Sequence, residues 1–249
     1  MDISLVMLGT GSAFAKTFYN NNALVACNDY KLLLDCGHTA PRALHELNIG
    51  LDAIDGIFIS HMHADHIGGL EEVAFRSMYT YKRKLSLFLP ETLIEPLWEH
   101  SLKGTLENRD DQIYKLDDYF RIVPLREANP ITVTDGFTLE IVPTIHIPGK
   151  PSYGVFLNEF VYYSADAVLD IGTLERLRDR GCRHILHECQ LHPPGYVHAT
   201  LESLLEMPED LQRMTYLMHY DDDMETFAGR TGHMTFIKQH EAYMFMKKQ

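Results

Sequence analysis

The run His61-Met62-His63-Ala64-Asp65-His66 constrains this chain more than any other part of its sequence. It sets three imidazoles and a carboxylate directly after the apolar segment 54–60, which we predict to be a strand buried on both faces. Such side chains are costly to gather at the end of a buried strand unless they bind something. Zinc accepts neutral imidazole and carboxylate as ligands, so the run predicts a metal site. A polar loop with scattered histidines is the alternative.

Three more residues of the same kinds follow apolar segments later in the chain: His146, Asp166 and His219. Each is expected at the carboxyl end of a strand, which is where layered α/β proteins usually carry their chemistry. In two-metal hydrolases a carboxylate can bridge ions that lie about 3.5 to 4 Å apart. These residues and the run at 61–66 together predict a dinuclear site, with two Zn²⁺ per chain and Mn²⁺ as a substitute.

Segments with strand and helix periodicity alternate along the sequence, separated by turn residues. We predict strands over 3–8, 23–26, 31–34, 54–60, 85–89, 132–142, 153–163, 184–187 and 214–218, with turns inside the two longest. We predict helices over 41–47, 70–81, 93–106, 168–178 and 200–205, the first with Thr39 as its N-cap. Each half mixes hairpins with βα units, which predicts an α/β fold of two mixed β-sheets packed face to face with helices outside. No repeat or linker interrupts the pattern, so a single domain over 1–249 is expected.

The formal net charge of −13 argues against DNA or tRNA as a partner, since affinity for these comes mainly from Lys and Arg at phosphates. A small anion held by metal ions escapes this objection, because the metals supply the positive charge. No apolar stretch reaches the roughly 18 to 20 residues that span a bilayer, and the N-terminus carries no cationic leader. The four cysteines form no CxxC pair, so we expect reduced, buried thiols, no membrane association and a cytoplasmic location.

From Ile3 to His219, the type and order of the candidate ligands resemble the metallo-β-lactamase superfamily. The resemblance implies that superfamily's αββα sandwich and two zinc ions. One zinc is then held by His61, His63 and His146. The other is held by Asp65, His66 and His219, with Asp166 bridging the two. The chain lacks the ligand cysteine of some true β-lactamases and the HxExD pattern of diiron relatives, which favours a two-zinc hydrolase.

Four short motifs resemble the RNase Z branch of that superfamily: Gly9-Thr10-Gly11-Ser12, Leu34-Asp35-Cys36-Gly37, His187-Glu188-Cys189 and His198-Ala199-Thr200. The resemblance implies a phosphodiesterase in which Asp65 and His198 are catalytic. Asp35, His187 and Glu188 are expected to support the ligands from behind. Two alternatives stay open: the first motif is only a tight turn, and His198 is a surface histidine at a helix N-terminus.

The chain also departs from RNase Z, which grips tRNA with a long arm between the third ligand and the bridging aspartate. Here His146 and Asp166 are only twenty positions apart, which leaves no room for an arm. A compact, acidic relative fits a small nucleotide, and the chain resembles the phage anti-Pycsar phosphodiesterases. That resemblance implies hydrolysis of the 3′,5′-cyclic nucleotides cyclic CMP and cyclic UMP, and of cyclic AMP and cyclic GMP as further substrates. It also implies a homodimer, located in the host cytoplasm where the gene is a phage's.

Two other functions compete with this interpretation. One is an RNase Z-like RNA 3′-processing endonuclease, and the other is a nucleotide-sequestering protein with structural zinc. Structural zinc sites are closed and usually rich in cysteine, so the His/Asp set makes sequestration the weaker of the two.

In the phosphodiesterase mechanism, two zincs activate water, Asp65 accepts its proton, and His198 protonates the departing 3′-oxygen. The residues that contact the base are unknown. Four aromatic residues are candidates for stacking, although their spacing fits core packing equally well: Phe75, Tyr79, Tyr81 and Trp98. Lys150 could meet a phosphate oxygen or simply be solvated.

Overall fold

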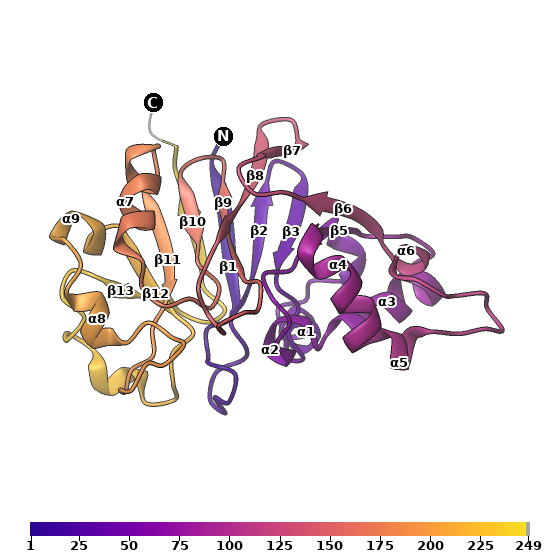
Figure 1. Cartoon of the computed structure of the whole chain (residues 1–249), viewed down its shortest axis with the longest axis horizontal. Coiled ribbons are helices and arrows are strands. Elements are labelled where there is room, and N and C mark those ends of the chain that lie inside the picture. The colour runs from indigo at the N-terminus through magenta and orange to yellow at the C-terminus, as the bar shows by residue number, and fades with distance from the viewer. Residues whose placement is uncertain (248–249) are drawn as a thin grey trace.

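Two seven-stranded sheets form the centre of the computed structural model, which describes residues 1–247 (Figure 1). In spatial order the first sheet contains β14 (Ala242–Phe245), β1 (Ile3–Gly9), β2 (Asn22–Cys27), β3 (Tyr30–Leu34), β4 (Gly56–Phe58), β5 (Ser86–Pro90) and β6 (Arg121–Leu125). The second contains β13 (Thr235–Phe236), β12 (Thr215–Met218), β11 (His184–Glu188), β10 (Val161–Tyr163), β9 (Tyr153–Leu157), β8 (Phe137–Pro143) and β7 (Ile131–Thr134).

Both sheets mix the two kinds of pairing. Strands β3 to β6 run parallel, while β14, β1, β2 and β3 pair antiparallel. In the second sheet β10 to β13 are parallel, and β7 to β10 are antiparallel. Parallel strands need crossover connections, and the helices supply them. The predicted architecture of two mixed sheets with helices outside is confirmed.

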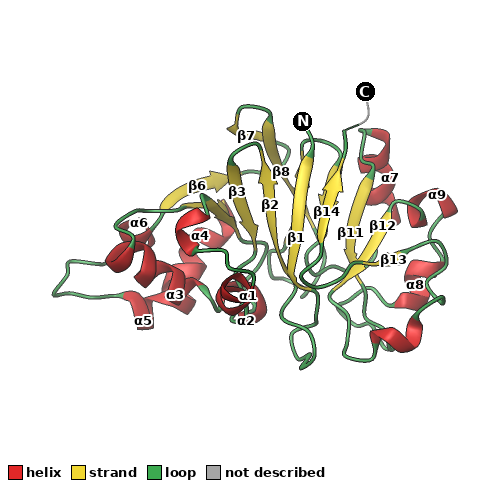
Figure 2. Cartoon of the chain, turned by 180° about the vertical axis from the view of Figure 1, so that it is seen from behind, coloured by secondary structure: helices red, strands yellow, loops and turns green. Residues whose placement is uncertain are grey.

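Helices cover the outer faces of both sheets, as the two opposite views show (Figures 1 and 2). Those of the first half are α1 (Ala40–Glu46), α2 (Ala64–Ile67), α3 (Leu70–Phe75), α4 (Glu91–Leu97), α5 (Lys103–Leu106) and α6 (Leu116–Tyr119). Those of the second half are α7 (Ile171–Asp179), α8 (Leu201–Leu205) and α9 (Glu209–Gln212). Two π-helical turns continue α3 and α4, and two short 3₁₀ turns lie elsewhere: Arg76–Thr80, Trp98–Leu102, Leu51–Ala53 and Met224–Phe227.

Apolar side chains hold the layers together. Leu5 and Val25 of the first sheet belong to the same buried cluster as Leu157 and Leu186 of the second. Another cluster packs α7 and α8 against β11 and β12. Burial of each Leu or Val side chain contributes about 1.5 to 3 kcal/mol. All four cysteines are buried free thiols, as the sequence predicted.

Several elements differ from the prediction. Strand β4 is shorter than segment 54–60, because the Ser60 N–H leaves the ladder and donates to Asp35 Oδ1 at 2.8 Å. Thr39 stands at the N-cap of α1, but its hydroxyl caps nothing; it accepts a hydrogen bond from the Asn20 N–H instead. The sequence indicated no strand at β6, β13 or β14.

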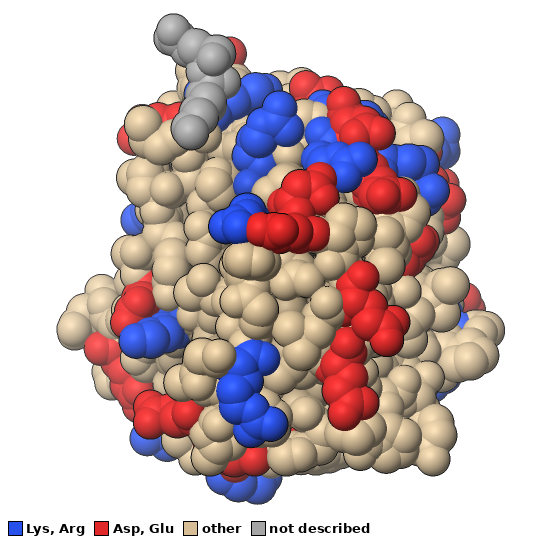
Figure 3. All heavy atoms as spheres, turned by 90° about the vertical axis from the view of Figure 1, so that its left-hand side faces the viewer, with Lys and Arg blue, Asp and Glu red and all other residues tan. Residues whose placement is uncertain are grey.

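The face over α7 and α9 carries basic and acidic side chains that interleave (Figure 3). Arg178 pairs with Asp179 and Asp210, and Arg180 with Glu140. The described residues of this face therefore form no continuous basic track of the kind that holds a nucleic acid backbone. No helix among residues 1–247 is long and apolar enough to cross a membrane.

Candidate metal centre

The ends of four strands bring the candidate ligands to one edge of the two sheets. The run at 61–66 follows β4 and continues into the first residues of α2, while His146 follows β8, Asp166 follows β10 and His219 follows β12. Three non-glycine residues here adopt the left-handed backbone region: Asp35 (φ 59°), Ala165 (φ 51°) and His219 (φ 56°). Each costs about 1 to 2 kcal/mol, and such residues cluster where a side chain must be aimed.

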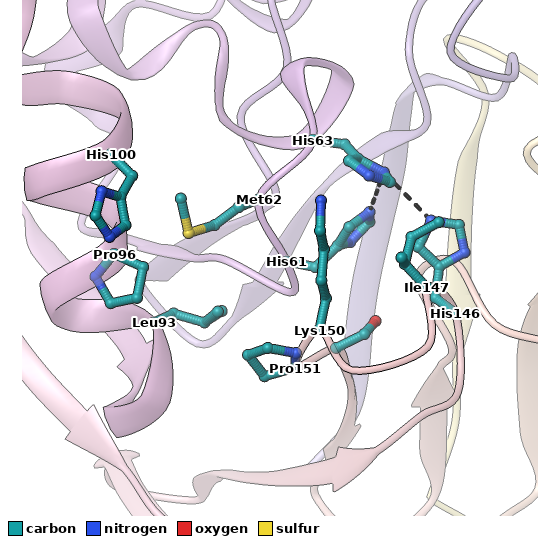
Figure 4. Close-up of a pocket in the computed structure, with 11 residues that line it drawn as sticks. His61, Met62, His63, Leu93, Pro96, His100, His146, Ile147, Lys150 and Pro151 are labelled. Carbon is teal, nitrogen blue, oxygen red and sulfur yellow. Dashed lines mark hydrogen bonds between the residues drawn. The ribbon is translucent and has the colours of Figure 1, made fainter.

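The first ligand cluster consists of His61, His63, His146 and Asp166, whose candidate ligand atoms lie within 4.8 Å of one another. His63 Nδ1 lies 3.1 Å from His61 Nε2 and 3.2 Å from His146 Nε2 (Figure 4). His146 Nδ1 donates to the Val197 carbonyl at 2.8 Å, so its Nε2 presents a lone pair to the cluster. Burial, and then His66, hold the pKa of His61 well below its usual value, which keeps this ring neutral and able to ligate.

Asp35 connects both halves of the centre from behind. Its Oδ2 accepts hydrogen bonds from His66 Nδ1 at 2.7 Å and from Ser60 Oγ at 2.8 Å. Because Ser60 donates its proton to the carboxylate, its oxygen accepts from His61 Nδ1 at 3.0 Å. Both imidazoles thus carry a proton on Nδ1, and both turn Nε2 toward the other candidate ligands.

The second ligand cluster consists of Asp65, His66, Asp166 and His219, all buried and within 4.8 Å. His66 Nε2 lies 3.2 Å from Asp65 Oδ2 and 3.3 Å from Asp166 Oδ1. His219 Nε2 lies 3.5 Å from Asp65 Oδ2 and 3.3 Å from Asp166 Oδ2. The facing atom of each residue is buried without a hydrogen-bond partner. Four converging orphaned atoms are unusual in a native core, and a cation between them would satisfy all four.

The pKa values of the residues in this cluster also indicate a place for a cation. Burial by itself lowers the pKa of His66 and His219, yet Asp166 and its neighbouring carboxylates raise both well above the usual value. Burial raises the pKa of Asp166, and His219 and His66 overcome it and hold that pKa well below its usual value. The carboxylates of the cluster therefore favour positive charge on the imidazoles that face them, and a metal ion that displaced these protons would supply it. The residues fit a divalent metal centre of imidazole and carboxylate ligands.

His198 borders this centre. Its ring centroid lies 4.9 Å from that of His146 and 5.2 Å from that of His219, on which it stacks. His198 Nδ1 bonds Glu188 Oε2 at 2.7 Å, and Glu188 Oε1 accepts from the Ala167 N–H. Burial lowers the pKa of His198, but the bond to Glu188 outweighs it, so the pKa is raised. The residue is a partly buried member of the site rather than a surface histidine.

His187 does not join the site. It precedes Glu188 in β11, and neighbouring side chains of a strand point to opposite faces. Its Nδ1 bonds the Glu188 carbonyl at 2.8 Å, and its ring lines a separate small cavity beside Tyr162. The sequence expectation that His187 supports the ligands is therefore not met by its position.

Two cavities open beside the ligands. One, of about 340 Å³, lies between His63 and helix α4; Figure 4 shows Leu93, Pro96 and His100 on the helical side, with Lys150 between the walls. The other, of about 370 Å³, is lined by Ser12, Phe14, His192, His198, His219 and Asp221. The four aromatic residues proposed for stacking line neither cavity: Phe75, Tyr79, Tyr81 and Trp98. Trp98 belongs to the buried core cluster, and Phe75 and Tyr81 pack against that cluster.

Two glycines explain motifs that were ambiguous in the sequence. A Cβ on Gly37 would lie 1.9 Å from the Asp65 carbonyl oxygen, so only glycine lets the loop after β3 approach the ligand loop. Asn22 joins the two loops, accepting from the Gly37 N–H at 2.9 Å and donating to the Asp65 carbonyl at 3.1 Å. A Cβ on Gly11 would lie 2.8 Å from that of Ala15, which fits a tight turn. Ser60, Asn22 and Asp221 carried no motif that could have identified them.

Comparison with known proteins identifies relatives over nearly the whole chain. The family model described as "Anti-Pycsar protein Apyc1" matches residues 3–243. A protein of that name from Paenibacillus xerothermodurans is 53% identical over 98% of both chains. Another, from Bacillus phage vB_BveM-Goe7, is 44% identical over 94% of this chain and 95% of its own.

Solved structures share the fold at low identity. YhfI from Bacillus subtilis, a metallo-β-lactamase fold protein, superposes with a TM-score of 0.77 at 18% identity, covering 98% of this chain and 100% of its own. A diphosphatase of the PhnP family superposes with a TM-score of 0.78 at 21% identity, over 98% of both chains. The short form of human tRNase Z gives 0.69 at 18% identity, again over 98% of both. The expected metallo-β-lactamase fold is confirmed, and the family model and the relatives confirm the resemblance to the anti-Pycsar proteins.

Proposed function

The chain belongs to the anti-Pycsar protein Apyc1 family, and from that premise we propose that it opens 3′,5′-cyclic nucleotides to 5′-monophosphates. The observation that carries the proposal is the His198–Glu188 pair. The two side chains are joined by a 2.7 Å hydrogen bond, and His198 lies beside the two ligand clusters. A metal centre with an adjoining proton donor suits hydrolysis of a phosphodiester. Cyclic CMP and cyclic UMP are the expected substrates, with cyclic AMP and cyclic GMP as further ones.

We assign two zinc ions to the centre, with Mn²⁺ as a substitute. His61, His63 and His146 would hold one, Asp65, His66 and His219 the other, and Asp166 faces both clusters. When bound, two such ions activate a water molecule and screen the charge of the phosphate. The donor set supports zinc, because it offers nitrogen and carboxylate oxygen and needs no thiol.

The protein's own groups then move the protons. Asp65 lies buried among the candidate ligands, so its other carboxylate oxygen would accept a proton from the attacking water while Oδ2 faces the metals. His198 holds the other proton. Its Nδ1 is engaged by Glu188, so Nε2–H is the group that can reach the departing 3′-oxygen. The raised pKa of His198 favours the protonated form that this step needs.

The rival RNA 3′-processing activity breaks the same type of bond, between phosphorus and a 3′-oxygen. The segment between His146 and Asp166 holds a short loop and the hairpin β9–β10, which is too little chain for a tRNA-gripping arm. The net charge of −13 also opposes a polyanionic substrate. Both observations favour the cyclic mononucleotide.

Zinc-loaded protein should be incubated with the four 3′,5′-cyclic nucleotides and with a precursor tRNA, and the products separated by chromatography. We expect 5′-monophosphates and uncut tRNA. Formation of 3′-monophosphates, or intact cyclic nucleotides beside cut tRNA, would contradict the proposal. Light scattering on the same preparation tests the expected homodimer.

A further inference from the structure

The cavity on the His198 side of the metal centre contains a carboxylate that the reaction does not use. We propose that this cavity holds the nucleoside of the substrate and that Asp221 accepts a hydrogen bond from its ribose 2′-hydroxyl. The inference rests on the proposed function. It concerns how a nucleotide lies in the site, rather than whether the site hydrolyses phosphodiesters.

The position of the acid decides which cavity takes the sugar. The departing 3′-oxygen belongs to the ribose, and a proton donor must come within about 2.6 to 3.2 Å of it. His198 lines the cavity shared by Ser12, Phe14 and Asp221, while the opposite cavity is lined by His61, His63 and His146 without it. The ribose therefore lies on the His198 side. Its 2′-hydroxyl, on the neighbouring carbon, enters the same cavity.

Asp221 is built to accept from a hydroxyl. Ser12 Oγ donates to its Oδ1 at 2.9 Å, which leaves Oδ2 as an acceptor. The backbone on both sides is fixed, because the Ser12 N–H donates to the Tyr220 carbonyl at 3.0 Å and the Tyr220 N–H to the Thr10 carbonyl at 3.0 Å. A carboxylate would repel a phosphate oxygen, so the fitting partner in this cavity is a neutral donor such as a sugar hydroxyl.

Phe14 supplies an apolar wall for the base. Its side chain is 86% exposed, although the loop that carries it, residues 11–19, is held at both ends. Gly11 N–H donates to the Tyr19 carbonyl at 2.8 Å, and the N–H groups of Lys16 and Thr17 donate to the Asp222 carboxylate at 2.7 to 3.0 Å. The loop projects beyond the end of β1 (Figure 1). An exposed ring on a loop that is held at both ends, beside a cavity of about 370 Å³, suits stacking on a base, and the volume lies within the roughly 300 to 1,000 Å³ typical of ligand sites.

The test combines a change in the enzyme with a change in the substrate. Zinc-loaded wild type and Asp221→Asn are compared on 3′,5′-cyclic CMP, on its 2′-deoxy analogue, and on bis(para-nitrophenyl) phosphate, which has neither sugar nor base. A hydrogen bond to a charged acceptor corresponds to about 10- to 100-fold in kcat/KM. Wild type should prefer the ribo substrate by about that factor. Asp221→Asn should lose most of this preference and keep its activity on bis(para-nitrophenyl) phosphate.

Two further variants complete the design. Phe14→Ala should raise KM for both cyclic nucleotides and leave kcat nearly unchanged. Asp210→Asn is the matched carboxylate control, since Asp210 is exposed and pairs with Arg178 on the far helical layer. It should behave as wild type on every substrate.

Failure of this inference is distinguishable from failure of the proposed function. If wild type hydrolyses cyclic CMP but treats the 2′-deoxy analogue equally, or if Asp221→Asn slows both alike, the nucleoside does not lie here. The nucleoside is also placed elsewhere if Lys150→Ala of the opposite cavity raises KM and Phe14→Ala does not. A wild type that cleaves bis(para-nitrophenyl) phosphate and no cyclic nucleotide would overturn both.

Discussion

Replacing Asp35 by Asn should weaken metal binding at both ligand clusters, although Asp35 itself ligates nothing. Its Oδ2 accepts from His66 Nδ1 and Ser60 Oγ, and Ser60 in turn accepts from His61 Nδ1. In the Asp35→Asn variant an amide nitrogen takes the place of Oδ2. This nitrogen is itself a donor, and it faces the two groups that donate to Oδ2 in the wild type, His66 Nδ1 and Ser60 Oγ. The network settles by reversing: Ser60 accepts from the amide and donates to His61 Nδ1, while His66 Nδ1 becomes an acceptor. Both imidazoles then carry their proton on Nε2, which blocks the lone pair that a metal needs.

Turning the amide over does not restore the wild-type pattern. Asp35 Oδ1 accepts from the Ser60 N–H at 2.8 Å, so the amide nitrogen would face a donor there as well. Asn tolerates the left-handed backbone at this position (φ 59°), so the substitution changes hydrogen bonding rather than conformation. Three charge-assisted bonds become neutral ones, which costs the metal-free protein about 1 to 3 kcal/mol. Metal affinity should fall by about 10- to 100-fold, the range for losing a partner that orients a ligand.

Competition with a chromophoric chelator measures the affinity of each ion, and ¹⁵N shifts of the imidazoles report their tautomers. Asp55→Asn is the matched control: Asp55 Oδ2 accepts from the Lys31 N–H at 2.9 Å, and an amide oxygen can replace it. If Asp35→Asn binds two metals as tightly as wild type, or if only one of the affinities changes, the relay through Ser60 is wrong.

Four other substitutions and the removal of metal test the remaining roles. His198→Ala should keep its metals and its Tm while kcat falls by about 10²- to 10⁴-fold, whereas His63→Ala should lose metal; elemental analysis beside kcat separates the two. Glu188→Gln should move the falling limb of the pH–rate profile to lower pH. Activity is lost as pH rises through the pKa of His198, and the bond from Glu188 raises that pKa against burial; an unmoved limb would remove Glu188 from this role. Asp166→Ala should release both ions, because its carboxylate faces both clusters. Metal-free protein should melt about 6 to 16 °C lower than protein at free metal about 100 to 1,000 times Kd, and an unchanged Tm would argue that the centre is not metal-linked.

The sequence predicted the strands with local periodicity and missed those defined by distant partners. Strand β14 pairs with β1, from the other end of the chain, and no local pattern announces that return. Strand β6 contains Pro124 and lies at the edge of its sheet, where proline is tolerated but weakens the strand pattern. These strands form because a neighbouring strand of the sheet pairs with them, and the local periodicity of a sequence carries no information about such distant partners.

The same distinction separates the site residues. The seven candidate ligands could be found because each follows an apolar strand and has the chemistry of a ligand. Ser60 and Asp221 could not, since a serine or an aspartate acquires its role only where loops meet in three dimensions. Ser12 reaches Asp221 across 209 positions of sequence. Conversely, the motif His187-Glu188 predicted that both residues support the site. The two are neighbours in β11, so their side chains point to opposite faces of the sheet.

The net negative charge of the chain is compatible with the anionic substrate proposed for it. The buried carboxylates are balanced at the centre, and the surface charges act only over short distances. Asp35, Asp65, Asp166 and Glu188 are buried at the centre, where imidazoles and the proposed cations balance them. The remaining excess lies on the surface, where interactions are screened within about 8 Å at physiological ionic strength. A cyclic mononucleotide carries one charge and meets mainly the centre. An RNA strand carries a charge at every nucleotide and extends beyond the centre, so it would meet the net negative charge of the chain. Under the proposed function, the net charge and the missing arm would therefore both favour a small anion over RNA, and neither effect depends on the other.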